Sequence, residues 1–244
     1  MKQVLVTCAA VCVAGVVVLA QEQQPGGFKN TVSLGVTMTD GNSKTLQANG
    51  AVVSEGEKVG LGSVRAGIEA NYGESTVNSN RETTVKNDKA FANVKKTITP
   101  RTFVSMDATA LHDDIAKIDY RATVGPGLGA YAVKNEKTSL SFEAAPTFVW
   151  ENVDDVYDRY FAIRFAERLT QALGGKAKMW QSAEFLPKAT DFGVYLVTAE
   201  LGVEAPLSAR VNLRLVLQDK YDSTPRADLE RNDVSLVAGV SLSL

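Results

Sequence analysis

Apolar and polar residues alternate along most of the chain after residue 27, in segments of about a dozen residues. Clusters of Gly, Asn, Asp, Lys or Pro separate these segments. The pattern is clearest near the C-terminus, where the segments 211–217 and 234–244 place an aliphatic or small apolar residue at almost every second position. Successive side chains of a β-strand point to opposite faces of its sheet, whereas a helix has a period of 3.6 residues. The alternation therefore predicts an all-β fold.

Twelve such segments can be counted, of which 89–95 and 177–185 have the weakest alternation. A tilted strand needs ~9–11 residues to cross a bilayer, whereas strands of soluble proteins average ~5–6 residues. Single-chain barrels of bacterial outer membranes have an even number of strands, and closure leaves no unpaired edge in lipid. We therefore expect a closed antiparallel transmembrane β-barrel of about twelve strands in an up-and-down meander, with its apolar face toward lipid.

The N-terminal segment differs from the rest of the chain. Residues 1–20 contain one lysine near the start, an apolar core and the small residue Ala20, and a polar stretch begins at Gln21. This order is typical of a secretory signal peptide cleaved between Ala20 and Gln21. A transmembrane anchor is the alternative, but the apolar core is shorter than the ~20 residues of a spanning helix. We expect a signal peptide at 1–20, a short segment at 21–27 and a barrel at 28–244.

Composition removes several function classes. The 26 Lys and Arg residues do not exceed the 28 Asp and Glu residues, so no basic surplus favours nucleic acid. The chain has one His and two Cys, and both cysteines lie inside the expected signal peptide. Neither a disulfide framework nor a cofactor or metal site is therefore expected.

Charged residues fall mostly on the face opposite the apolar stripe, so they are expected to point into the barrel lumen. These luminal candidates are Arg65, Glu69, Asp107, Arg121, Glu143, Arg164, Arg168, Glu184, Glu200, Arg214 and Lys220. They could line a hydrophilic pore, or they could pair across a narrow interior and block it. Eight-stranded barrels are filled by side chains and sixteen-stranded barrels leave a channel, so twelve strands leave both possibilities.

Some features of the segments and their connections give further expectations. If both termini are periplasmic, the long stretches 74–85, 151–157 and 221–232 are extracellular. The glycine-rich segment 125–129 lacks the Lys-Ser or Lys-Thr pair of a phosphate loop, and a bend or bulge of the barrel wall at Pro126 is expected instead. Glu167 falls on the lipid face unless a bulge shifts the register. Four aromatic residues are expected at the membrane interfaces, namely Tyr72, Tyr131, Trp150 and Tyr221.

Enzyme chemistry has one candidate centre. His112 is followed by Asp113 and Asp114 at a predicted extracellular strand end, and outer-membrane proteases place Asp and His around an activated water. A protease site would need further acids from another connection, such as Asp154 or Asp155, and a phospholipase would need a Ser beside His112. More commonly, such acids are simply solvated charges at the rim of a barrel, that is, at the ends of its strands. The acids at 154–155, 228 and 230 are also candidates for binding divalent cations.

Short motifs in a consistent order carry a resemblance. The segments Gly35–Ser43, Gly125–Gly129 and Arg164–Leu169, with Asn232-Asp233, resemble landmarks of the salt-induced outer-membrane protein family, a domain family of unknown function (DUF-481). The last six residues, from Gly239, resemble the assembly signal of outer-membrane barrels but end in Leu rather than Phe. The resemblance implies a bacterial outer-membrane location, contact with outer-membrane lipid and with the barrel assembly machinery, and an association with salt or envelope stress. It implies no established reaction.

The sequence thus favours an exported, non-enzymatic outer-membrane barrel that is either a narrow porin-like channel or a structural envelope component. Two alternatives from other classes remain: a surface hydrolase that uses His112, and a soluble periplasmic β-protein that binds a ligand. Solute, selectivity and oligomeric state do not follow from the sequence.

Overall fold

The computed structural model describes residues 27–39, 43–77, 80–225 and 230–244. The expected signal peptide, its cleavage site between Ala20 and Gln21, and the candidate cation ligand Asp228 lie outside the described residues. No helix among the described residues is long and apolar enough to span a membrane.

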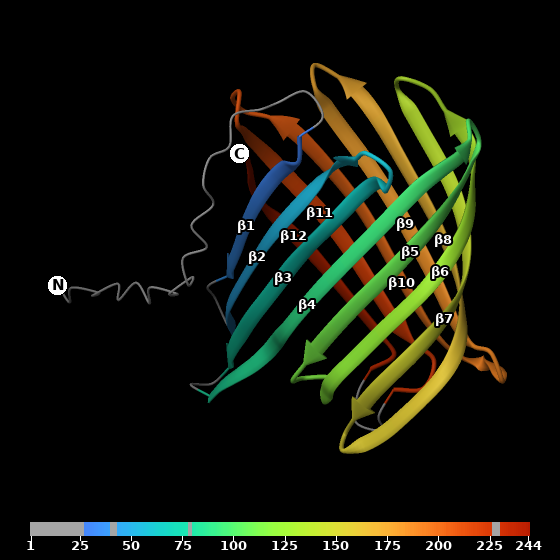
Figure 1. Cartoon of the computed structure of the whole chain (residues 1–244). Coiled ribbons are helices and arrows are strands. Elements are labelled where there is room, and N and C mark those ends of the chain that lie inside the picture. The colour runs from blue at the N-terminus through green and yellow to red at the C-terminus, as the bar shows by residue number, and fades with distance from the viewer. Residues whose placement is uncertain (1–26, 40–42, 78–79, 226–229) are drawn as a thin grey trace.

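Twelve antiparallel strands make up the structure (Figure 1). Their bounds are β1 (Lys29–Thr39), β2 (Ser43–Lys58), β3 (Gly62–Val77), β4 (Asn80–Thr99), β5 (Thr102–Asp113), β6 (Ile118–Lys134), β7 (Thr138–Val153), β8 (Val156–Gly174), β9 (Ala177–Lys188), β10 (Asp191–Pro206), β11 (Val211–Asp222) and β12 (Asn232–Ser243). Each strand pairs with its neighbours in sequence, and β1 pairs with β12, which closes the barrel. The predicted twelve-stranded meander is confirmed.

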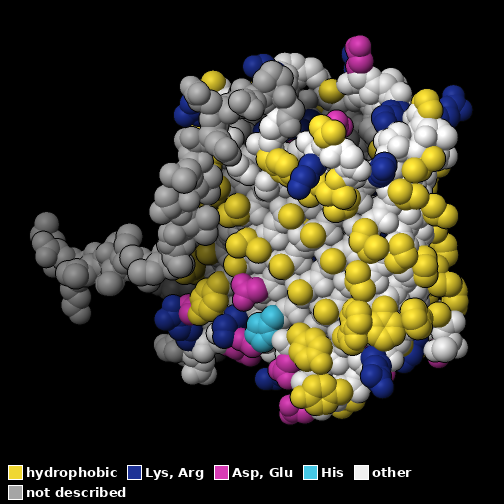
Figure 2. Space-filling model, viewed as in Figure 1, with side chains coloured by type: hydrophobic (Ala, Val, Ile, Leu, Met, Phe, Trp, Pro, Cys, Tyr) yellow, Lys and Arg dark blue, Asp and Glu magenta, His cyan; other side chains and the backbone are white. Residues whose placement is uncertain are grey.

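The apolar stripes form the outer wall. Val32 of β1 lies opposite Val52 of β2, and Val52 lies opposite Ile68 of β3, so the register keeps aliphatic residues on one face. Ile68 is 55% exposed and Leu215 of β11 is 46% exposed. Hydrophobic side chains spread over the middle of the wall in Figure 2, while charged side chains gather toward both ends. Soluble monomers rarely expose an apolar surface of this extent, so the wall is suited to lipid.

The strands reach further than their apolar stripes. β3 continues to Val77 and β4 begins at Asn80, so most of the stretch 74–85 is strand. Between β7 and β8 only Asp154 and Asp155 form the turn, both with positive φ, as in the type I′ turns of two-residue hairpins. The predicted long connections at 74–85 and 151–157 are therefore wrong, because main-chain pairing continues after the side-chain alternation has faded.

Glycines on the luminal face receive large side chains. Gly129 of β6 lies opposite Phe103 of β5, and a Cβ at Gly129 would overlap the Phe103 ring. Trp180 of β9 lies over Gly202 of β10 in the same way. Pro126 stays in register with β5, and the register with β7 is the same on both sides of 125–127, so a bulge at this position is wrong; the pairing with β7 is interrupted there. The missing side chains let inward aromatic rings lie against the wall.

Part of the interior is apolar and packed. Val149 of β7, Ala162 of β8 and Leu186 of β9 are buried together, with Tyr160 and Leu196 against them. This cluster lies toward the end of the barrel that carries the β7–β8 turn. The alternation predicted only a polar inner face, because an apolar residue on the polar face of a strand carries no periodic signal.

Candidate functional site: the charged lumen

A cavity of about 320 Å³ occupies the interior of the barrel. Nine of the eleven sequence-predicted luminal charges line it: Arg65, Glu69, Asp107, Glu143, Arg164, Arg168, Glu184, Glu200 and Arg214. Arg121 and Lys220 are not among its lining residues. Arg121 pairs with Glu151 of the neighbouring strand at 2.5 Å, and Lys220 lies opposite Asp233 near the end of β11.

Arg164 of β8 is the centre of the largest charged network. Its Nη2 atom donates to Asp107 Oδ2 of β5 at 2.7 Å and to a carboxylate oxygen of Glu143 of β7, and its Nη1 atom donates to Glu184 Oε2 of β9 at 3.1 Å. The Arg164 side chain is 12% exposed and that of Glu143 is 8% exposed. One guanidinium thus joins carboxylates from three other strands, in the multidentate geometry for which arginine is suited.

Neighbouring polar groups complete this network. Lys95 Nζ lies 3.8 Å from Glu143 Oε2, and Ser105 Oγ donates to Glu143 Oε1 at 2.8 Å. Asn93 Nδ2 donates to Asp107 Oδ1 at 2.7 Å. Two cations and two amide or hydroxyl donors therefore share three carboxylates. Such sharing offsets the cost of removing the charges from bulk water.

A second network surrounds Glu200 of β10. Trp180 Nε1 donates to Glu200 Oε1 at 2.5 Å, and Gln218 Nε2 donates to Glu200 Oε2 at 3.0 Å. The Arg214 guanidinium lies 4.8 Å from the centre of the Trp180 ring and donates to Ser33 Oγ at 3.2 Å. Sequence reasoning missed Trp180 as a luminal residue, and the glycine opposite it is the one signal that could have indicated an inward ring.

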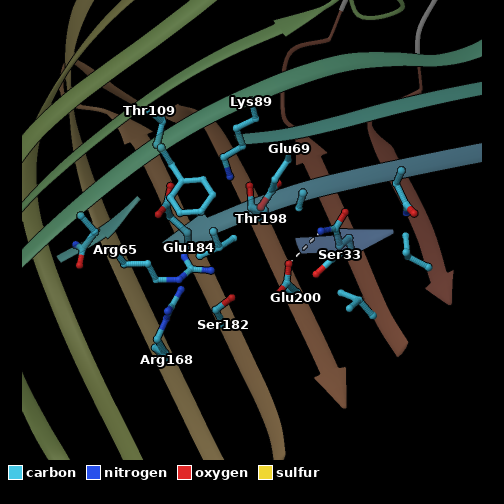
Figure 3. A pocket seen from close by; sticks show the side chains of 18 of the residues that line it. Ser33, Arg65, Glu69, Lys89, Thr109, Arg168, Ser182, Glu184, Thr198 and Glu200 are labelled. Carbon is cyan, nitrogen blue, oxygen red and sulfur yellow. Dashed lines mark hydrogen bonds between the residues drawn. The ribbon is translucent and has the colours of Figure 1, made fainter. Parts of the chain in front are cut away.

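A third group contains two arginines that face each other. Arg65 of β3 and Arg168 of β8 point toward one another in the cavity, as Figure 3 shows, and their positive charges interact. Arg65 lies over the Phe91 ring at 4.7 Å and has a long ion pair of 3.9 Å with Glu55. Arg168 forms no hydrogen bond or ion pair with any residue that the structure describes, although its charge acts on the Glu200 carboxylate.

Lys89 and Glu69 lie directly opposite each other on β4 and β3, also on the cavity wall (Figure 3). The weak alternation of the segment 89–95 had hidden Lys89 from the sequence-based set. Basic and acidic residues line the cavity in similar number, but the acidic partners are concentrated around Arg164.

The geometry around His112 gives little support to a hydrolase. Its Nδ1 atom lies 2.9 Å from the backbone oxygen of Asp119, and its Nε2 atom lies 3.0 Å from Asp114 Oδ1. Both ring nitrogens are thus engaged, and within the described residues no Ser hydroxyl is bonded to the ring. No group of three or more potential metal ligands occurs in the described part of the chain.

The acids beside His112 have structural partners. Asp113 Oδ1 accepts the backbone N–H groups of Ile115 and Ala116 and so caps the β5–β6 turn. Asp114, in that turn, pairs with Lys86 Nζ at 2.5 Å. The hydrogen bond and charge of Lys86, together with His112, hold the pKa of the Asp114 carboxyl below its usual value. These contacts favour a rim held together by ion pairs.

Two other predictions about side-chain positions can be compared with the structure. The register is unbroken around Glu167, so its side chain is on the outer face, where Gln181 Nε2 donates to it at 3.3 Å. Tyr131 is not an interface residue: its ring packs against the buried luminal Phe103 ring, with 5.1 Å between centroids. Tyr72 and Trp150 are exposed, each 41%.

The sequence matches a known protein family. The family model described as "Protein of unknown function, DUF481" matches residues 32–243. The chain belongs to this family. The association with salt, implied by the earlier resemblance, stays a prediction. No curated protein matches the sequence.

Solved structures of outer-membrane proteins are among those similar to this chain. The NanC porin is 9% identical with a TM-score of 0.57, and the alignment covers 88% of this chain and 100% of that one. The KdgM porin in complex with disordered oligogalacturonate is 7% identical with a TM-score of 0.48, over 88% and 99%. Outer membrane phospholipase A from Escherichia coli is 14% identical with a TM-score of 0.45, over 88% and 90%. The likeness to the NanC porin shows that this DUF481 chain has a porin-like fold.

Proposed function

We propose that this DUF481 protein is a narrow channel of the bacterial outer membrane through which small hydrophilic solutes pass. The observation that carries the proposal is a cavity of about 320 Å³, lined by charged and polar side chains, inside a closed barrel with an apolar outer wall. At roughly 30 Å³ per water molecule this volume corresponds to about ten waters. A purely structural component of the envelope does not need a charged cavity in its interior.

The proposed location rests on the wall and on the sequence. The exposed aliphatic belt is suited to lipid, and residues 1–20 have the features of an export signal. In this proposal the barrel contacts outer-membrane lipid and is inserted by the barrel assembly machinery. A soluble periplasmic β-protein would have to cover this belt.

The channel is proposed to be narrow because side chains occupy much of the interior. The apolar cluster around Val149 and Leu186 fills one part of the cross-section, and the Arg164 network crosses another. Sixteen-stranded porins leave a wide aqueous channel, whereas this barrel has twelve strands. Small solutes therefore fit this lumen better than large ones.

The test is the conductance of the folded, detergent-purified protein in planar lipid bilayers. A mobility shift on boiling before electrophoresis first establishes that the barrel is folded. We expect small, discrete conductance steps from the folded protein and none from the boiled protein. Folded protein without conductance above that of the bare bilayer would refute the channel.

A matched pair of variants shows that the current passes through the lumen. Ala166 lines the cavity, while the adjacent Phe165 is on the outer face and 43% exposed. Ala166→Trp should reduce the unit conductance, because the indole takes up luminal volume, whereas Phe165→Trp should leave it unchanged. Equal conductance of both variants would place the current outside this lumen.

A further inference from the structure

The cations of the lumen differ in how well they are neutralised. Arg164 has three carboxylate partners, Lys95 is near Glu143, and Arg214 has the Trp180 ring and a serine hydroxyl. Within the described residues Arg168 has no hydrogen bond or ion pair and acts on Glu200 only through its charge, and Arg65 has the long contact to Glu55 and the Phe91 ring. The nearby carboxylates act on these two arginines over longer distances than on Arg164, so their positive charge is less fully compensated.

The two arginines come from nearly opposite sides of the barrel. β3 and β8 are separated by four strands along one side of the wall and by six along the other. Both side chains line the cavity and point toward one another (Figure 3). A solute that moves through the cavity can therefore contact both guanidinium groups at once.

The nearby carboxylates neutralise this pair only in part. Glu200 acts electrostatically on both arginines and Glu69 acts on Arg65, but among the described residues neither carboxylate forms an ion pair with Arg65 or Arg168. Both oxygens of Glu200 already accept hydrogen bonds, from Trp180 and Gln218. The donors of the Arg168 guanidinium remain available to a ligand.

We infer that Arg65 and Arg168 form a binding site for the anionic group of a solute, a carboxylate or a phosphate, within the lumen. The planar guanidinium fork matches both groups in bidentate geometry, and Arg or Lys side chains in a pore favour anions. An anion between the two groups would also relieve their mutual repulsion. This inference deepens the proposed channel function and rests on it for the route by which the solute arrives.

The first measurement is ion selectivity in planar bilayers under a KCl gradient. The reversal potential should show that chloride is preferred over potassium, and Arg168→Gln should lower the permeability ratio several-fold toward unity. Arg65→Gln/Arg168→Gln should abolish the preference. Arg159→Gln is the matched control, because Arg159 lies at the strand end opposite Trp150 on the outer face, and it should leave the ratio unchanged. A wild-type channel that prefers potassium, or Arg168→Gln with the wild-type ratio, would overturn the site.

The second measurement is independent of conduction, so it separates failure of the site from failure of the channel. Binding of inorganic phosphate to the folded, detergent-solubilised protein is followed by its phosphorus NMR linewidth, and binding of labelled acetate by its carboxyl carbon linewidth. Loss of one charge-assisted contact of ~1.5–3 kcal/mol corresponds to binding weaker by about tenfold or more, so broadening should be lost in the double variant. Broadening by one anion alone would identify the preferred group. Equal broadening by the wild type and the double variant, or none in either, would refute the site even if the channel conducts.

Discussion

Removal of the Arg164 charge should destabilise the barrel more than removal of any rim charge. Arg164→Met keeps most of the side-chain volume but leaves the carboxylates of Asp107, Glu143 and Glu184 without their shared cation. Breaking a buried ion pair by removing one partner costs ~3–5 kcal/mol, whereas exposed pairs contribute ~0–1 kcal/mol. Glu143 is 8% exposed and Glu184 is 42% exposed, so most of the loss comes from the Glu143 and Asp107 contacts. We expect a loss of about 3 kcal/mol in the free energy of unfolding.

The assay is reversible urea unfolding of the protein in lipid vesicles, followed by tryptophan fluorescence, with Arg159→Met as the rim control. The control should stay within ~0.5 kcal/mol of the wild type. The double variant Glu143→Gln/Arg164→Met should be more stable than Arg164→Met alone, because it removes one of the uncompensated charges. Wild-type stability of Arg164→Met, or a double variant less stable than the single one, would refute the argument that Arg164 neutralises this network.

Two further predictions concern the outer wall and the rim. Leu215→Arg on the lipid face of β11 should cost ~2–4 kcal/mol of folding free energy in vesicles. Tyr157→Arg should cost only ~0–1 kcal/mol, because Tyr157 lies near the end of β8 and is 75% exposed. Equal costs would contradict the assignment of the outer wall to lipid. At the rim, Lys86→Met should raise the Asp114 pKa toward its ordinary 3.8, measured by carboxyl NMR titration in micelles. Because the pKa of Asp114 is lower in the folded protein than in the unfolded chain, the Lys86–Asp114 pair stabilises the fold above the unfolded pKa. This stabilisation is lost as the pH falls through the folded pKa. An unchanged titration midpoint in Lys86→Met would exclude Lys86 as the cause of the lowered Asp114 pKa.

Strand ends were less predictable than strand positions. The alternation near Tyr72 stops before the strand does, since β3 runs on to Val77 with polar side chains on both faces. Main-chain hydrogen bonds need no particular side chain, so the pairing extends past the apolar stripe. The same reasoning explains the two-residue turn at Asp154 and Asp155, where a longer connection was expected.

The interior also carried features that alternation does not encode. Phe103 and Trp180 point inward because Gly129 and Gly202 leave room for their rings on the neighbouring strands. Which glycine lies opposite which ring depends on the register between two strands. The sequence of one strand alone therefore does not show which residue of the neighbouring strand an inward apolar side chain will contact.

The sequence by itself determined the class of fold, the number of strands and, for the strands with clear alternation, the face on which their charges lie, because the two-residue period is a local property of an extended chain. Only the tertiary structure decided which charges meet. Arg164 reaches Asp107 across 57 residues of sequence, and Arg65 faces Arg168 across the lumen. Those encounters depend on closure of the barrel and on the register of all its strands. Closure places some cations among carboxylates and leaves two arginines facing each other.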